Sequence, residues 1–169
     1  MAARLHIHGH EYLNPGAWLI CPGHEVLLMP LLNWKPEYSV NREDMDRNHQ
    51  EMFHILNSVY DNLMNSRESG FLLPSIDRLS AIAKYQLLME EQFLREMHVP
   101  DIDHHIAEHR EFTESIEMIR NDCNDNHLEA SKELIILLGE WLFNHVLKED
   151  RKYSHLMGIP GTEGKALDH

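Results

Sequence analysis

The sequence predicts an all-α protein, an antiparallel up-down-up-down four-helix bundle with an N-terminal extended arm. Three observations support this prediction. Four segments carry apolar residues at the spacing of an amphipathic helix, polar or Pro- and Gly-containing stretches separate them, and strand-like alternation is nearly absent. Four helices of about 19 to 30 residues with short links are what such a bundle requires.

The first two helices are expected between residue 41 and Pro100. The first runs from about Asn41 to Ser66. Its apolar side chains, among them Leu56, recur about once per helical turn along one face. The second starts after Pro74 and ends before Pro100, because proline is poorly tolerated inside a helix.

The last two helices are bounded by polar turns. The third covers roughly Asp103 to Asn121 and stops in the stretch "NDCNDN". The fourth spans about Leu128 to Met157 and ends at "GIPGTEG". Both segments repeat apolar residues with the helical period, so each is expected to bury one face against the other helices.

Three regions follow from this pattern: an arm (1–40), the bundle (41–157) and a flexible tail (158–169). The arm is rich in Pro, Gly and aromatic residues without a sustained period, so we expect it to lie extended on the bundle. Its cluster "HIHGH" at 6–10 is interpreted as incidental, because His clusters near a terminus seldom form constrained metal sites.

Charge and cysteine content limit the classes of partner and the compartment. The net charge of −13, with 15 Lys and Arg, argues against binding to nucleic acid or to an anionic membrane surface. The apolar run at 17–34 is interrupted by Pro22, Gly23 and Pro30, so it predicts neither a membrane span nor a signal peptide. Cys21 and Cys123 lack the spacing of a disulfide framework or a thiolate zinc site. We therefore expect a cytoplasmic protein.

Two pairs of metal-ligand residues stand in the third and fourth predicted helices. His105 and His109 are four residues apart, which places the two imidazoles about 40° apart on one face of a helix. His145 and Asp150 are five residues apart, roughly 140° around a regular helix. Those two can face one point only if the Asp side chain reaches back or the helix locally widens.

The other two helices supply matching residues, Glu90 in the second and His49 in the first. A single His in an amphipathic helix is usually a surface or core residue, and adjacent glutamates are usually a solvated face. The coincidence of imidazoles and carboxylates on four successive helices instead favours a metal site inside the bundle.

These motifs resemble those of the hemerythrin family, specifically the bacterial hemerythrins, over about residues 31–155. The resemblance is carried by "NWKPEYSV" followed by "DRNH", by "MEEQFL", by "HIAEHREF" and by "WLFNHVLKED". It implies a non-haem centre of two iron ions, oxo- or hydroxo-bridged, that binds O₂ reversibly. The ligands implied are His105, His109 and His145 on one iron, Glu90 and Asp150 as bridges, and His49 on the second iron.

One position departs from the family pattern. The pattern has a further His four residues before the bridging Glu, and this chain has Gln86 there. An amide oxygen is a weaker and harder donor than imidazole. Gln86 would therefore ligate through oxygen, hold a metal-bound water, or leave the second metal weakly bound or lost.

No other histidine is expected to replace the missing ligand. His54 lies five residues after His49 and so points about 140° away from it, toward the surface. His104 is adjacent to His105 and faces elsewhere, and His98 is expected in a turn.

An apolar lining for a bound ligand is expected from Phe53, Leu87, Trp141 and Val146. Such a lining would limit proton access and irreversible oxidation, although ordinary core packing explains these residues equally well. The altered second site predicts faster autoxidation than in a pure O₂ carrier.

The favoured function is storage, delivery or sensing of O₂ by a binding protein, with O₂ or a related diatomic or peroxide as its ligand. A sensor would act through a protein partner, since no signalling domain is seen in the sequence. The alternatives are a di-iron oxidase or peroxidase and a mononuclear-metal bundle without reversible O₂ binding. A ferritin-like di-iron site is disfavoured because only one E-x-x-H motif, "EMFH", occurs among the helices.

Overall fold

The computed structural model describes residues 30–65, 69–100, 102–123 and 126–157. The described part is helical, without a strand, which confirms the all-α class. Its long elements are α1 (Glu43–Met64), α2 (Leu72–Glu96), α3 (Ile102–Asp122), α4 (His127–Glu140) and the π-helical segment η3 (Trp141–Asp150). The short ones are the 3₁₀ turns η1 (Pro36–Tyr38) and η2 (Ser69–Phe71) and the helix α5 (Ser154–Met157).

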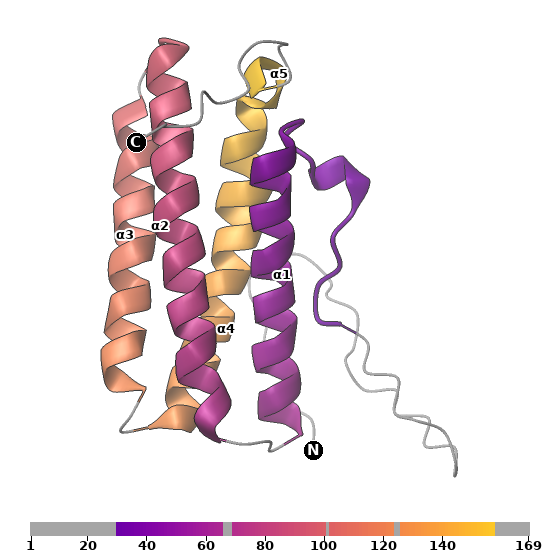
Figure 1. The fold of residues 1–169 in the computed structure, drawn as a ribbon, viewed down its shortest axis with the longest axis vertical. Coiled ribbons are helices and arrows are strands. Elements are labelled where there is room, and N and C mark those ends of the chain that lie inside the picture. Colours follow the sequence, from indigo (N-terminus) through magenta and orange to yellow (C-terminus); the bar gives the residue numbers. More distant parts are fainter. Residues whose placement is uncertain (1–29, 66–68, 101, 124–125, 158–169) are drawn as a thin grey trace, which may run out of the picture.

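The helices form the predicted antiparallel bundle. Helix α1 packs against α2 and α4, and α3 packs against the same two helices. Successive helices run in opposite directions, so the starts of α1 and α3 lie at the same end as the end of α2 and the segment η3 (Figure 1). Residues far apart in the sequence are thereby brought to one end of the bundle.

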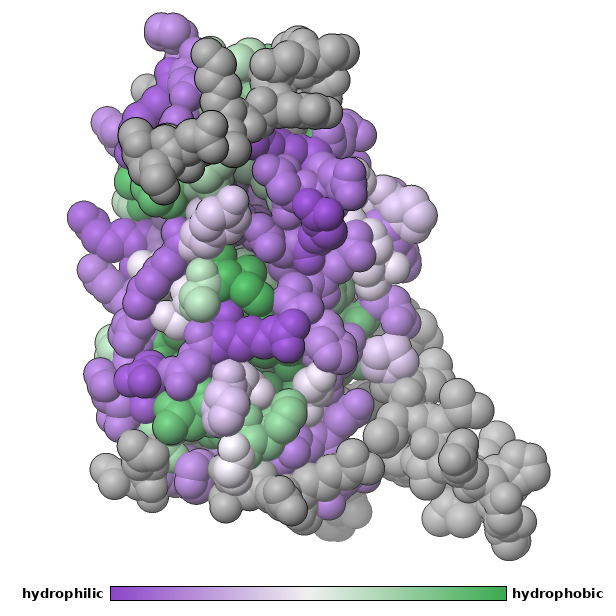
Figure 2. Space-filling view, viewed as in Figure 1, coloured by the Kyte–Doolittle hydropathy of each residue, from purple (hydrophilic) through white to green (hydrophobic). Residues whose placement is uncertain are grey.

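A hydrophobic core runs through the bundle. Side chains with at most 1% exposure come from all four helices and include Met52, Leu56, Ile76, Leu79, Ile116, Leu134 and Leu138. The face seen in Figure 2 is mostly hydrophilic, with small hydrophobic patches separated by polar residues. This separation of apolar inside from polar outside is what the helical periodicity predicts.

Helix α2 starts earlier than expected. It begins at Leu72 and therefore contains Pro74, whereas the sequence predicted a start after that proline. The first backbone N–H groups of a helix have no partner within it, so a proline in the first turn costs no hydrogen bond. At its other end α2 closes with His98 in the left-handed conformation (φ 51°) and the Val99 N–H donating to the Leu94 carbonyl (3.1 Å).

The fourth predicted helix is not one regular element. It starts at α4, where the Asn126 side chain accepts a hydrogen bond from the Glu129 N–H (3.3 Å). It continues through the wider η3, and the helical path is then interrupted before α5. Hydrophobic periodicity alone does not distinguish an α-helical from a π-helical turn, so the helix predicted over about 128–157 is observed as successive helical segments.

The described part of the arm lies against the bundle, as expected. Leu32 pairs with the Asn57 side chain through both its N–H (3.0 Å) and its carbonyl (2.7 Å). Asp46 accepts hydrogen bonds from the Ser39 hydroxyl (2.5 Å) and the Val40 N–H (2.9 Å). These contacts attach the segment before α1 to the body of that helix.

Several predictions concern residues outside those that the structure describes. They are the role of "HIHGH" at 6–10, the first part of the arm (1–29) and the tail (158–169). Within the described residues, no helix combines the length and hydrophobicity needed to cross a membrane.

Candidate metal centre

Six residues with metal-ligand side chains meet inside the bundle, near the end where α1 and α3 begin. All six are buried, with exposures of 0 to 4%. They are His49 of α1, Glu90 of α2, His105 and His109 of α3, and His145 and Asp150 of η3. The antiparallel order of the helices accounts for this meeting, since each contributes from the part nearest that end.

Three imidazoles form one half of the cluster. A ring nitrogen from each of His105, His109 and His145 lies within 4.8 Å of the others. The shortest separation, 3.0 Å, joins Nε2 of His109 to Nε2 of His145. The spacing of four residues on α3 places its two histidines on one face, as the sequence predicted.

Two carboxylates lie beside the imidazoles. Glu90, His105 and Asp150 form a second group whose ligand atoms all lie within 4.8 Å. Nε2 of His105 is 3.6 Å from Oε1 of Glu90 and 3.9 Å from Oδ1 of Asp150. His105 therefore belongs to both groups.

His49 lies on the other side of the carboxylates. Its Nε2 is 3.4 Å from Oδ2 of Asp150, while Oδ1 of the same carboxylate is 3.1 Å from Nε2 of His145. The Asp150 carboxylate thus stands between His49 and the three-histidine group, with one oxygen directed to each side.

The π-helical segment η3 explains how Asp150 reaches this position. Its hydrogen bonds join residues five apart, so side chains at that spacing lie near each other along the helix. His145 and Asp150 are five apart and both point into the cluster. Of the two arrangements that the sequence left open, local widening of the helix is the one observed.

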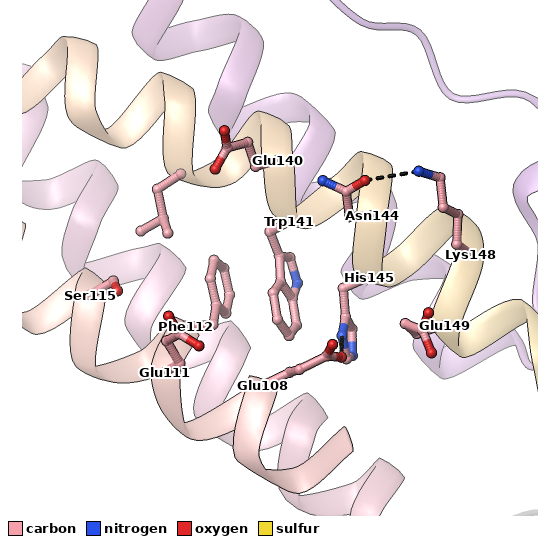
Figure 3. Close-up of a pocket in the computed structure, with 11 residues that line it drawn as sticks. Glu108, Glu111, Phe112, Ser115, Glu140, Trp141, Asn144, His145, Lys148 and Glu149 are labelled. Carbon is pink, nitrogen blue, oxygen red and sulfur yellow. Dashed lines mark hydrogen bonds and ion pairs between the residues drawn. The ribbon is translucent and has the colours of Figure 1, made fainter. Parts of the chain in front are cut away.

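Two further carboxylates, which sequence reasoning missed, hold the outer nitrogens of the imidazoles. Nδ1 of His109 donates to Oε1 of Glu91 (3.1 Å), and Nδ1 of His145 donates to Oε2 of Glu108 (2.9 Å; Figure 3). Carboxylates in this position are the usual outer partners of metal-binding histidines. Glu108 lies next to His109 in the sequence but holds His145 of another helical segment, so no local sequence signal pairs the two.

An aromatic stack lies beside the cluster. The Trp141 ring lies parallel to the His145 ring (centroids 3.8 Å apart) and to the Phe112 ring (4.0 Å), as Figure 3 shows. Beside this stack is a cavity of about 450 Å³, and its rim includes Glu108 and Glu111. His145 lines this cavity together with Trp141 and Phe112, so the three-histidine group borders the cavity through His145.

The four side chains expected to line a ligand site are all buried. Phe53, Leu87, Trp141 and Val146 belong to the main hydrophobic cluster of the bundle. Trp34, from the arm, packs edge-on against Phe53 (5.6 Å) and lies 6.4 Å from the ring of His49. Burial of the four side chains is established, while their role in lining a ligand site stays a prediction.

Burial shifts the pKa values of the clustered groups in different directions. Burial, reinforced by the neighbouring imidazoles, lowers the pKa of His109 to about 2, so this ring is neutral at physiological pH. Burial and the charge of Asp150 raise the pKa of Glu90. For Asp150 and His145 burial is outweighed by the closeness of the two groups, 3.1 Å from Oδ1 to Nε2, which lowers the pKa of Asp150 and raises that of His145.

The cluster has the chemistry of a cation site. Buried ligand atoms on His49, Glu90, His105 and Asp150 have no hydrogen-bond partner, although buried polar groups are normally paired. When both rings are neutral, as metal ligation requires, Nδ1 of His109 and of His145 donates outward and the two Nε2 atoms direct lone pairs at each other across 3.0 Å. A cation between these lone pairs would relieve their repulsion, so the residues present fit a bound metal.

Three histidines outside the cluster, His54, His98 and His104, are placed as the sequence predicted. His54 and His104 are exposed on their helices, and His98 occupies the turn after α2. Gln86 is 2% exposed, and its Oε1 is buried without a partner. It lies one turn before Glu90 on the same face of α2.

Comparisons with known proteins agree with this arrangement. The family described as "Hemerythrin HHE cation binding domain" matches residues 40–156. A bacteriohemerythrin of Campylobacter jejuni is 30% identical over 122 residues, which cover 68% of this chain and 86% of that protein.

Two more distant relatives are similar over comparable lengths. A bacteriohemerythrin of Clostridium acetobutylicum is 23% identical over 124 residues, 71% of this chain and 96% of that protein. A myohemerythrin of Theromyzon tessulatum is 22% identical over 120 residues, 71% of this chain and 88% of that protein. Because the family match spans well over half of the sequence, the chain belongs to the hemerythrin family of non-haem iron-binding proteins.

Proposed function

We propose that the chain is a di-iron protein that binds O₂ reversibly, for storage, delivery or sensing of oxygen. One observation carries the metal site: Nε2 of His109 and Nε2 of His145 face each other at 3.0 Å while both Nδ1 atoms are held by carboxylates. Once both rings are neutral, imidazoles in that arrangement direct their Nε2 lone pairs to a common point, as metal ligands do.

The ligands divide between two positions. His105, His109 and His145 would hold one iron, and His49 would hold the other. Glu90 and Asp150 would bridge them, since each carboxylate has two buried oxygens without a hydrogen-bond partner. Two bridging carboxylates also neutralise part of the charge that two divalent cations bring into a buried site.

The surrounding residues determine how such a centre behaves. Iron, when bound, supplies the electrons for reversible O₂ binding. Glu91 and Glu108 fix the orientation and tautomer of His109 and His145. Phe53, Leu87, Trp141 and Val146 exclude water and proton donors from the neighbourhood of the ligand, which slows irreversible oxidation.

A binding role is favoured over an enzymatic one by these same lining residues. None of the four carries an ionisable group, so none could act as a general acid or base toward a substrate. The neighbouring carboxylates Glu91 and Glu108 are already engaged with imidazoles.

Iron stoichiometry, measured together with absorption spectra of the anaerobic and the oxygenated protein, tests the proposal. We expect two irons per chain and a visible absorption that appears with air and disappears on deoxygenation. One iron per chain with no oxygen-dependent spectrum would identify a mononuclear protein, and substrate-dependent consumption of O₂ would identify an oxidase or peroxidase; either result would overturn the proposal.

A further inference from the structure

The two halves of the metal-ligand cluster offer different sets of donor atoms. One half has three imidazole nitrogens, from His105, His109 and His145. The other half has a single imidazole, that of His49, and its remaining charged donors are the carboxylates Glu90 and Asp150, which also face the first half. The second half is therefore poor in nitrogen and rich in oxygen.

Gln86 is a buried polar residue of α2 near Glu90. Its side chain is buried on the face of α2 that carries Glu90, one helical turn away. Its Oε1 has no hydrogen-bond partner, and the same is true of both ring nitrogens of His49. An amide oxygen left unpaired in a core is costly, so this atom calls for a partner.

We propose that Gln86 binds the second metal through Oε1, and that the two metal positions are consequently unequal in affinity and in preference. The inference rests on the proposed metal centre and concerns its second position only. The three-histidine position fills first, while the position of His49 and Gln86 binds more weakly and accepts a harder divalent cation such as Mn²⁺ alongside Fe²⁺.

The preference follows from the donor atoms. Imidazole nitrogen favours Fe²⁺ over Mn²⁺, whereas carboxylate and carbonyl oxygens suit Mn²⁺ and other hard cations. Replacing one imidazole by a neutral amide oxygen lowers the affinity for Fe²⁺ more than the affinity for Mn²⁺. The second position therefore discriminates less between these two metals than the first.

The test begins with anaerobic titration of the full metal-free chain with Fe²⁺, followed by Mn²⁺. Bound metal is counted after removal of free ions, and bound Mn²⁺ is followed by its electron paramagnetic resonance signal. We expect two separate binding steps in the Fe²⁺ titration, the second at least about tenfold weaker. After one equivalent of Fe²⁺, one equivalent of Mn²⁺ should bind; failure of Mn²⁺ to bind there would overturn the proposed preference.

Variants at position 86 assign the second step to this residue. Gln86→Leu keeps the approximate size and should abolish the second step while leaving the first intact. Gln86→His adds a nitrogen donor, so it should raise the affinity of the second position for Fe²⁺ by about tenfold or more. It should also lower the fraction of that position that Mn²⁺ occupies. Gln92→Leu, at an exposed site of the same helix, is the matched control and should change neither step.

Gln86→Glu keeps the test decisive if the Leu variant does not fold. This variant retains an oxygen donor at position 86. The second position should therefore bind metal at least as tightly as in the wild type and still accept Mn²⁺, in contrast to the His variant. Identical second steps in wild type and in all the position 86 variants would overturn the role of Gln86 while leaving the proposed metal centre in place. Absence of the first step from wild type would instead overturn the metal centre itself.

Discussion

His145 and Asp150 meet across 3.1 Å, from Nε2 to Oδ1, although five residues separate them in the sequence. On a regular helix that spacing would turn the two side chains roughly 140° apart. The π-helical segment Trp141–Asp150 brings them to the same point. A local change in helix type thus delivers a carboxylate to the centre of the cluster, where it faces His49 on its other side.

Replacing Asp150 with Asn tests its role as a bridge. The amide has nearly the same shape but no charge, so it cannot balance two cations in the core. We expect the variant to bind at least one metal ion fewer per chain than the wild type, measured by elemental analysis after dialysis. Asp122→Asn, at an exposed position of α3, should leave the metal count unchanged. Full occupancy in the Asp150 variant would contradict the bridging role.

Glu108→Gln tests the carboxylate that holds His145. Loss of the charge weakens the hydrogen bond at Nδ1 and makes the imidazole a poorer donor at Nε2, so metal affinity should fall by about 10- to 100-fold. Competition with a chromophoric chelator measures the change. Glu111 lies on the rim of the same cavity and is exposed, so Glu111→Gln provides the control. Equal affinities in the two variants would show that the Glu108 contact is incidental.

Metal removal should destabilise the bundle. A ligand that binds only the folded state stabilises it by about 4 kcal/mol when its free concentration is a thousand times its Kd. For a domain of this size, that corresponds to a change in Tm on the order of 10 °C. Calorimetry of the iron-loaded and the chelator-treated protein measures the difference. A Tm that stays the same after complete metal removal would argue against a buried metal centre.

Trp34→Ala tests whether the arm segment next to α1 is part of the folded unit. Trp34 is half-buried and packs edge-on against both Tyr38 and Phe53. Losing these contacts should lower the free energy of unfolding by about 1–3 kcal/mol, as measured by urea denaturation. Leu31 is 43% exposed, and Leu31→Ala should change this free energy by no more than about 0.5 kcal/mol. Similar values for both variants would mean that the segment packs only loosely.

The thiol of Cys123 should react slowly while the protein is folded. Burial raises the pKa of this thiol, so at pH 8 it holds less of the reactive thiolate than a free cysteine, and alkylating reagents also have little access. Alkylation followed by peptide mass spectrometry should find this residue modified in urea but hardly at all without it. Rapid modification under native conditions would show that the loop end of α3 opens readily.

The helices and the candidate ligands could be predicted because both are recorded in local patterns. Spacing of apolar residues marks which face of each helix is buried, and the candidate ligands lie on those faces at 49, 90, 105, 109, 145 and 150. Likewise the exposure of His54 and His104 follows from their angular offset from His49 and His105.

The outer carboxylates could not be recognised in the same way. Glu91 and Glu108 stand beside ligand residues in the sequence, where adjacent glutamates usually form a solvated face. Only the packing of α2 and η3 against α3 brings them to Nδ1 of His109 and of His145. Such contacts cross between helices, and the periodicity of a single helix contains no information about them.

By itself the sequence determined the helical class, the four-helix topology and the buried face of each helix, because these depend on residue order and periodicity. Only the tertiary structure decided the π-helical geometry of Trp141–Asp150 and the start of α2 at Leu72. It also decided the 3.0 Å separation between Nε2 of His109 and Nε2 of His145. These features depend on how neighbouring helices pack, and distances of a few ångströms between side chains of different helices are set by that packing.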